Sequence, residues 1–230
     1  MPVLELLTSS SLGSLLGMRH ALEPDHLAAV STLVTGERGT YRGAMLGACW
    51  GIGHTVSLLA VGAVLVLLRA EMPARASTAF ELCVALMLVG LGVRAIYLAA
   101  IQGPSGPVHV HHHGRTVHVH PGTTAHVHIG AWTLARRPLL VGAVHGLAGG
   151  GALTALVLTT LPSTAARLTY MTVFGLGSTI GMAALSGLLG WPLARVGGHH
   201  TVARGVSLVV GCVSTALGLA WGYPLLGRIL

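Results

Sequence analysis

Residues 17–30 read GMRHALEPDHLAAV and place a polar cluster inside an otherwise apolar segment. Its ionisable side chains are Arg19, His20, Glu23, Asp25 and His26. On insertion scales, a charged side chain at the centre of a membrane helix costs about 2.5–3.5 kcal/mol, so such residues usually face a partner or a cavity. If the surrounding chain crosses a membrane, this cluster marks a functional site.

The composition indicates an integral membrane protein. Of the 230 residues, 53% are hydrophobic and only 8% are charged, against about 25% charged residues in a typical soluble domain. Too few polar residues are present to cover a soluble globule of this size. The basic residues are all arginines, most of them in short loops and near span ends, which favours a role in membrane orientation and excludes a nucleic-acid partner.

Six apolar segments are each long enough to cross a hydrocarbon core of about 30 Å as a helix. They cover residues 12–34, 43–68, 79–101, 138–161, 165–190 and 203–227. The loops after the first, third and fifth segments hold seven arginines, against four on the other side. Because cytoplasmic loops are rich in basic residues, we expect these three loops to face the cytoplasm and the protein to be multi-pass in the cytoplasmic membrane.

An internal repeat relates the two halves of the chain. GMRHAL at 17–22 matches GAVHGL at 142–147, and WGIGHT at 50–55 matches FGLGST at 174–179, at nearly the same offset. Three spans in each half would give the copies opposite orientations, as in many secondary transporters. The predicted fold is therefore all-α, with repeats at 1–101 and 138–230 joined by a cytoplasmic linker at 102–137.

The spacing of the ligand-type residues requires a break in the first span. On a continuous helix, Asp25 and His26 would lie about 140° and 240° around the axis from His20. Pro24 removes a helical hydrogen bond and clashes with the carbonyl of residue 20, so we expect the helix to break there. The repeat aligns residues 24–26 with the glycines at 149–151, which predicts a break in both first helices.

His20, Asp25 and His26 are the predicted metal ligands, because imidazole and carboxylate groups suit divalent transition metals. His54, in the repeated GIGHT stretch of the second span, is the expected fourth ligand or a partner that orients one. His145 and Pro24 are expected to support the site from outside the ligand set. Arg19 and Glu23, at i and i+4, are expected to pair with each other.

The linker holds eight of the 14 histidines of the chain. They are His109, His111, His112, His113, His118, His120, His126 and His128. Alternation of valine and histidine favours a β-hairpin around Gly114 and Arg115, although a disordered tract fits the composition equally well. We interpret the tract as an accessory metal-collecting loop; the alternative is a tolerated low-complexity linker.

RHALEPDH has the form H-x4-D-H and resembles the signature of the nickel/cobalt transporter family. GIGHTVS resembles the second motif of that family, and VGAVHGLAGGGALTALVL with the histidine-rich loop resembles its shorter branch, labelled urease accessory or high-affinity nickel-transport protein. The resemblance implies that His20, Asp25, His26 and His54 select and carry Ni²⁺ or Co²⁺. It also implies nickel-enzyme maturation proteins as partners.

The expected function is a secondary transporter of nickel or cobalt, with no permanently bound cofactor. The alternative within transport is an exporter of the same ions. A membrane metalloenzyme or haem protein using the same residues is the alternative from another class. The sequence contains no HExxH motif, serine-nucleophile motif or P-loop, so neither an enzyme nor ATP hydrolysis within this chain is expected.

Overall fold

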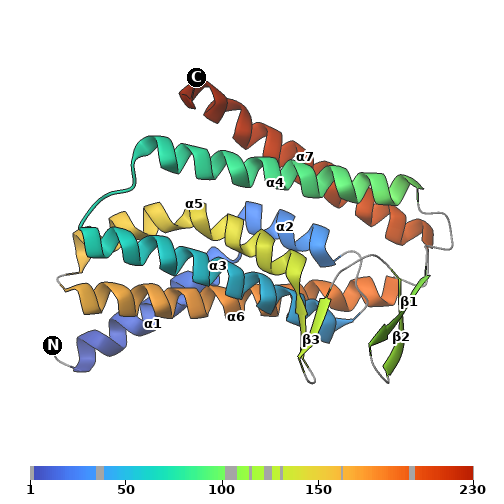
Figure 1. Ribbon diagram of the computed structural model, residues 1–230, viewed down its shortest axis with the longest axis horizontal. Coiled ribbons are helices and arrows are strands. Elements are labelled where there is room, and N and C mark those ends of the chain that lie inside the picture. Colours follow the sequence, from blue (N-terminus) through green and yellow to red (C-terminus); the bar gives the residue numbers. More distant parts are fainter. Residues whose placement is uncertain are drawn as a thin grey trace.

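The computed structural model describes residues 3–34, 39–101, 108–113, 116–121, 126–129, 132–161, 163–196 and 200–229. Seven helices and two short hairpins occupy these residues (Figure 1). The helices are α1 (Val3–His20), α2 (Pro24–Val34), α3 (Thr40–Leu68), α4 (Ala74–Ile101), α5 (Arg136–Thr160), α6 (Thr164–Val196) and α7 (His200–Ile229). The strands are β1 (Val108–His113), β2 (Thr116–Pro121), β3 (His126–Ile129) and β4 (Trp132–Ala135).

Four helices of the described part of the chain are long and apolar enough to cross a membrane. They are α3, α4, and the segments Thr164–Pro192 of α6 and Thr201–Arg228 of α7. Each corresponds to one of the six predicted spans. The other two predicted spans correspond to the α1–α2 pair and to α5, which are not among the four. The count of six spans therefore stays a prediction.

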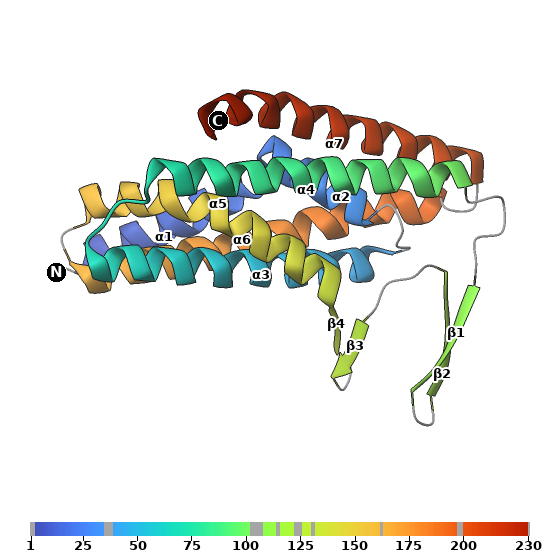
Figure 2. The same ribbon diagram turned by 45° about the horizontal axis from the view of Figure 1, so that its top comes forward.

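The helices form two groups that lie along each other (Figures 1 and 2). In one group, α3 packs against both α5 and α6, and α1 packs against α6. In the other, α4 pairs with α7, while α2 lies between the groups and contacts mainly α7. A buried apolar cluster that includes Val30, Val34, Leu88 and Met182 joins the two groups.

The break at Pro24 is confirmed. Helix α1 ends at His20 and α2 begins at Pro24, a position where proline is tolerated because the first N–H groups of a helix have no intrahelical acceptor. Between them the chain turns, with Leu22 N–H donating to Arg19 O at 2.9 Å and Glu23 N–H to His20 O at 3.1 Å. The first half of the chain therefore begins with two helices rather than one.

The predicted break at the glycine run is wrong, because α5 continues from Arg136 to Thr160 through residues 149–151. Glycine keeps its N–H and has no ring, so it lowers helix stability by only about 1 kcal/mol per residue relative to alanine. Proline inside a helix costs about 3 kcal/mol or more. Packing against α3 is enough to keep the glycine-containing helix whole.

The linker forms two antiparallel hairpins, β1–β2 and β3–β4, which project sideways from the helices near one end of the bundle (Figure 2). We call this the hairpin end; the opposite, distal end carries the α3–α4 connection at residues 69–73. The β1–β2 register places His109 opposite His120 and His111 opposite His118. A hairpin was expected here, whereas its expected turn at residues 114–115 lies outside the described residues.

Candidate metal centre

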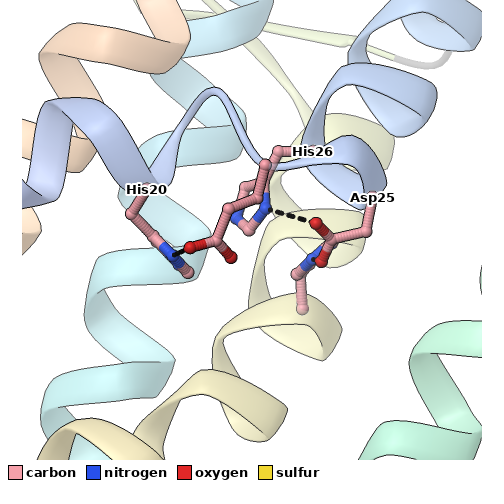
Figure 3. A network of polar contacts seen from close by, with 5 residues as sticks. His20, Asp25 and His26 are labelled. Carbon is pink, nitrogen blue, oxygen red and sulfur yellow. Dashed lines mark hydrogen bonds and ion pairs between the residues drawn. The ribbon is translucent and has the colours of Figure 1, made fainter.

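Four separate segments bring five ligand-type side chains to one place. His20 ends α1, Asp25 and His26 lie in the first turn of α2, His54 lies in the middle of α3, and His145 lies on α5. Figure 3 shows His20 on one side of the helix break and Asp25 and His26 on the other. The break therefore lets the side chains of Asp25 and His26, five and six positions after His20, point to the same region as His20.

The first group consists of His20, His26 and His54. One nitrogen from each ring lies within 4.8 Å of the others. The centroid of the His20 ring lies 4.4 Å from that of His26 and 5.3 Å from that of His54. His26 and His54 are 1% and 0% exposed. This arrangement is a set of three imidazoles, two buried and His20 partly buried, with the size of a transition-metal site.

Asp25 joins His26 to His145. Its Oδ1 lies 3.2 Å from His26 Nδ1, and its Oδ2 lies 2.7 Å from His145 Nε2. These three residues form a second group with metal-ligand geometry. His145 is therefore adjacent to the predicted ligands, as expected for a supporting residue, and it contacts Asp25 directly.

The expected pairing of Arg19 with Glu23 is wrong. The Glu23 carboxylate lies 3.0 Å from His20 Nδ1, and no ion pair joins it to Arg19 within the described part of the chain. The turn between α1 and α2 replaces the helical i,i+4 geometry that the Arg19 pairing needed. Glu23 is therefore part of the centre rather than a neighbour of it.

Several nitrogen atoms in the centre are buried without a hydrogen-bond partner. They are His20 Nε2, His26 Nε2, both ring nitrogens of His54 and His145 Nδ1. A buried polar atom without a partner costs about 1–3 kcal/mol, and native proteins have few of them. Five in one small region indicate that a ligand completes the arrangement.

A cavity of about 410 Å³ leads from the centre toward the distal end. Beyond the histidines, its lining includes Glu81 near the start of α4, Leu156 near the end of α5, Phe174 on α6 and Trp221 in the last third of α7. All four lie in the distal part of their helices. The Glu23 side chain also lines the cavity and is 53% exposed, so the cavity reaches the surface.

Trp50 lies on the other side of the centre, toward the hairpin end of α3. It is fully buried, and its ring lies 5.4 Å from that of His26 and 6.0 Å from that of His145. A methyl group at Gly142 would lie 2.8 Å from Trp50 Cδ1, so α5 packs tightly on this side chain. The indole closes the centre toward the hairpins. Sequence reasoning overlooked it, although WGIGHT places it four residues before His54.

The histidines of the linker lie on β1, β2 and β3, at the hairpin end of the bundle (Figure 2). The second-half counterparts of His54 and Thr55 are Ser178 and Thr179. Ser178 is buried, and Thr179 hydrogen-bonds to Thr55 at 2.9 Å between their hydroxyl oxygens. The second half thus supplies helix contacts where the first supplies ligand-type groups.

Comparison with known proteins identifies the family. A model of the NicO family, described as high-affinity nickel-transport protein, matches residues 7–196. The chain is 32% identical to the urease accessory protein UreH of Bacillus sp. (strain TB-90), over 98% of this chain and 95% of that protein.

A more distant relative comes from a plant. The chain is 30% identical to the chloroplast protein FOR GROWTH AND FERTILITY 2 of Arabidopsis thaliana, over 81% of this chain but only 48% of that protein. No solved structure matches. With a family match over most of its length and a relative that it covers almost completely, the chain is a membrane transport protein, not an enzyme, and belongs to the NicO family of high-affinity nickel-transport proteins.

Proposed function

We propose that this protein is a secondary transporter that carries Ni²⁺, and also Co²⁺, across the cytoplasmic membrane, with the ion bound at His20, Asp25, His26 and His54. The observation that carries the proposal is the convergence of three imidazoles, each with one ring nitrogen within 4.8 Å of the others, at a place where five buried ring nitrogens have no hydrogen-bond partner. Imidazole suits Ni²⁺ and Co²⁺, and the carboxylate of Asp25 offsets part of their charge. The ion is cargo, so it binds and leaves in each cycle.

In this proposal the two halves of the chain form an inverted repeat around the site. Contacts made by one half recur in the other: Gly17 packs on Phe174 and Ser178, while Gly142 packs on their repeat counterparts Trp50 and His54. Gly51 meets Thr179 and Gly175 meets Thr55, so the counterpart helices α3 and α6 run antiparallel. These paired contacts support two inverted halves, 1–101 and 138–230, that rock around the ion.

In the proposed cycle, the described conformation is open toward the distal end. The cavity leads to the distal end, and Trp50 fills the space toward the hairpin end. The arginine distribution favours the hairpin end as cytoplasmic, which makes this the outward-facing state. Release into the cytoplasm then requires α3 and α5 to separate at the contact between Trp50 and Gly142.

The linker at 102–137 has an accessory role in this proposal. Two histidine pairs face each other across the β1–β2 register, at the end where the ion would leave. The hairpins are suited to collecting the metal there. Similarity to a urease accessory protein supports delivery of nickel to enzyme maturation proteins.

The test is metal flux in proteoliposomes, with Ni²⁺, Co²⁺, Zn²⁺ and Mn²⁺ compared in both directions. We expect saturable flux of Ni²⁺ and Co²⁺, lost in His20→Ala and His54→Ala and retained in the control His200→Ala at the start of α7. Metal extrusion from the cytoplasmic side alone would make the protein an exporter. Normal flux in both cluster variants would disprove the site.

A further inference from the structure

The centre contains two carboxylates that each touch an imidazole at the same ring position. Glu23 Oε1 lies 3.0 Å from His20 Nδ1, and Asp25 Oδ1 lies 3.2 Å from His26 Nδ1. A carboxylate accepts hydrogen bonds and does not donate them, so the Nδ1 atoms must carry the hydrogens. In a neutral imidazole, Nε2 is then left with its lone pair free to bind a metal.

The free Nε2 atoms are those that the structure leaves unpartnered. His20 Nε2 and His26 Nε2 are both buried and make no hydrogen bond, and His54 beside them has neither nitrogen satisfied. In both His20 and His26, therefore, Nδ1 contacts a carboxylate and Nε2 of the same ring is free. Metal-binding histidines commonly have this arrangement, with the second nitrogen donating to a carboxylate that fixes the ring.

Glu23 is held in place by the helix break itself. Its N–H donates to His20 O at 3.1 Å, and its carbonyl accepts from Leu27 N–H at 2.9 Å. Backbone and side chain of Glu23 therefore both contact His20. In a continuous helix the residue would not make this backbone contact, so the break created by Pro24 positions the orienting carboxylate as well as the ligands.

We propose that Glu23 is a positioning residue for the transported ion: it holds His20 in the Nδ1–H form, as Asp25 holds His26, so that three imidazole nitrogens rather than the carboxylates contact the metal. The two carboxylates, one step removed, supply the two negative charges that balance a divalent cation. This inference rests on the proposed metal site and refines it: Asp25, which that proposal places among the residues that bind the ion, orients His26 and does not touch the metal.

The second oxygen of Asp25 distinguishes the two carboxylates. It contacts His145 of the second half at 2.7 Å, while Glu23 contacts a histidine of its own half across the turn. Loss of Asp25 disturbs two imidazoles and the contact between the halves. Loss of Glu23 disturbs His20 alone, which makes Glu23 the cleaner subject for a test.

The test compares Glu23→Gln with Glu81→Gln in the purified full-length protein in lipid nanodiscs. Glu81 lines the same cavity but accepts a hydrogen bond from Ser77 at 3.2 Å; in the described part of the chain it makes no ion pair with a histidine. Both variants remove one carboxylate charge and keep the side-chain size. Only the Glu23 variant replaces the pure acceptor at His20 with an amide that also donates.

Binding of Co²⁺ is followed by its visible absorption, and histidine tautomers by ¹⁵N NMR. We expect Glu23→Gln to weaken binding about 10- to 100-fold, to convert part of His20 to the Nε2–H form, and to leave the absorption spectrum at saturation unchanged. Glu81→Gln is expected to bind as the wild type does. The unfolding temperature without metal is expected to match the wild type in both.

Three results would overturn the inference: a changed spectrum of the saturated Glu23→Gln protein, which would make Glu23 a ligand; unchanged affinity; or equal weakening in Glu81→Gln. The proposed function fails separately, if the wild type shows no saturable binding or if His54→Ala binds as tightly as the wild type. Unchanged affinity in Glu23→Gln, with His54 still required, would remove only the role of Glu23.

Discussion

The first helices of the two halves have similar sequences but different structures. In the first half, GMRHAL leads into Pro24, and the chain divides into α1 and α2. In the second half, GAVHGL leads into three glycines, and α5 stays whole. Four of the five ligand-type residues at the centre come from the first half, and α5 contributes only His145.

The difference teaches what each interruption does for a binding site. Proline redirects the chain, so side chains that a helix would separate meet at one place. Glycine leaves the direction of the helix unchanged and removes bulk. A methyl group at Gly149 would lie 3.9 Å from His20 Nε2 and 3.8 Å from His54 Cε1. In the proposed site, the first half thus supplies most of the ligand-type groups, and the second half leaves room for the ion.

The largest expected effect comes from removing an imidazole of the first half. His26→Ala deletes a ring that lies against His20, His54 and His145, so we expect Ni²⁺ binding and flux to fall below detection. His145→Ala removes a partner of Asp25 and is expected to weaken binding about tenfold. Isothermal titration of both variants measures the contrast. Equal losses would mean that the two halves share the ligand role.

Pro24→Ala tests whether the break is needed. Without the ring, a continuous helix is no longer opposed by about 3 kcal/mol, and that helix separates His20 from His26. If packing retains the broken form only in part, apparent affinity falls with its population, by about 10- to 100-fold. Titration with Co²⁺ measures the affinity, and circular dichroism measures the added helix. Unchanged affinity would show that tertiary packing alone holds the break.

The smallest effect on metal binding is expected at the glycines of α5, where Gly149 and Gly146 should respond differently to substitution by alanine. Gly149→Ala meets only ordinary contacts and gains up to about 1 kcal/mol of helix propensity, yet its methyl group borders the proposed ion site. We expect unchanged or higher thermal stability and metal binding weakened a few-fold. A loss of stability instead would mean that residue 149 serves helix packing.

Gly146→Ala is the matched variant for this comparison. Its methyl group would lie 3.0 Å from the His54 carbonyl carbon, and closer still to the oxygen. Overpacking of this kind costs about 1–3 kcal/mol, so we expect lower thermal stability in Gly146→Ala. If both alanine variants behaved alike in unfolding and in titration, the proposed division between packing and room for the ion would be wrong.

Local rules were sufficient where one residue acted on its own neighbours. Membership of the nickel-transport family and the helix break at Pro24 were both predicted from local sequence features, and both are confirmed. The ligand roles of His20, Asp25, His26 and His54 stay predictions, although the structure places the four together. Local rules wrongly predicted a helix break at the glycine run. Glycine destabilises a helix by only about 1 kcal/mol per residue, so packing of α5 against α3 determines whether the helix stays whole.

Side-chain partners were also beyond the reach of sequence spacing. Arg19 and Glu23 have the separation of a helical ion pair, but the turn at residues 21–23 directs Glu23 to His20 instead. The positions of Trp50 and Phe174 beside the centre could not be predicted, because aromatic residues are common in apolar spans. Their places beside the centre depend on how α3 and α6 cross the other helices.

The sequence by itself determined that this chain is a membrane protein of the nickel-transport family, with a broken first helix that carries an H-x4-D-H motif. Composition and proline act locally, so they can be read residue by residue. The tertiary structure decided which nitrogens remain free, which carboxylates hold which rings, and which side of the centre is open. The contact of Asp25 with His145 joins segments more than a hundred residues apart. The contact of Glu23 with His20 is local, but it depends on the geometry of the turn between α1 and α2, which residue spacing alone did not show.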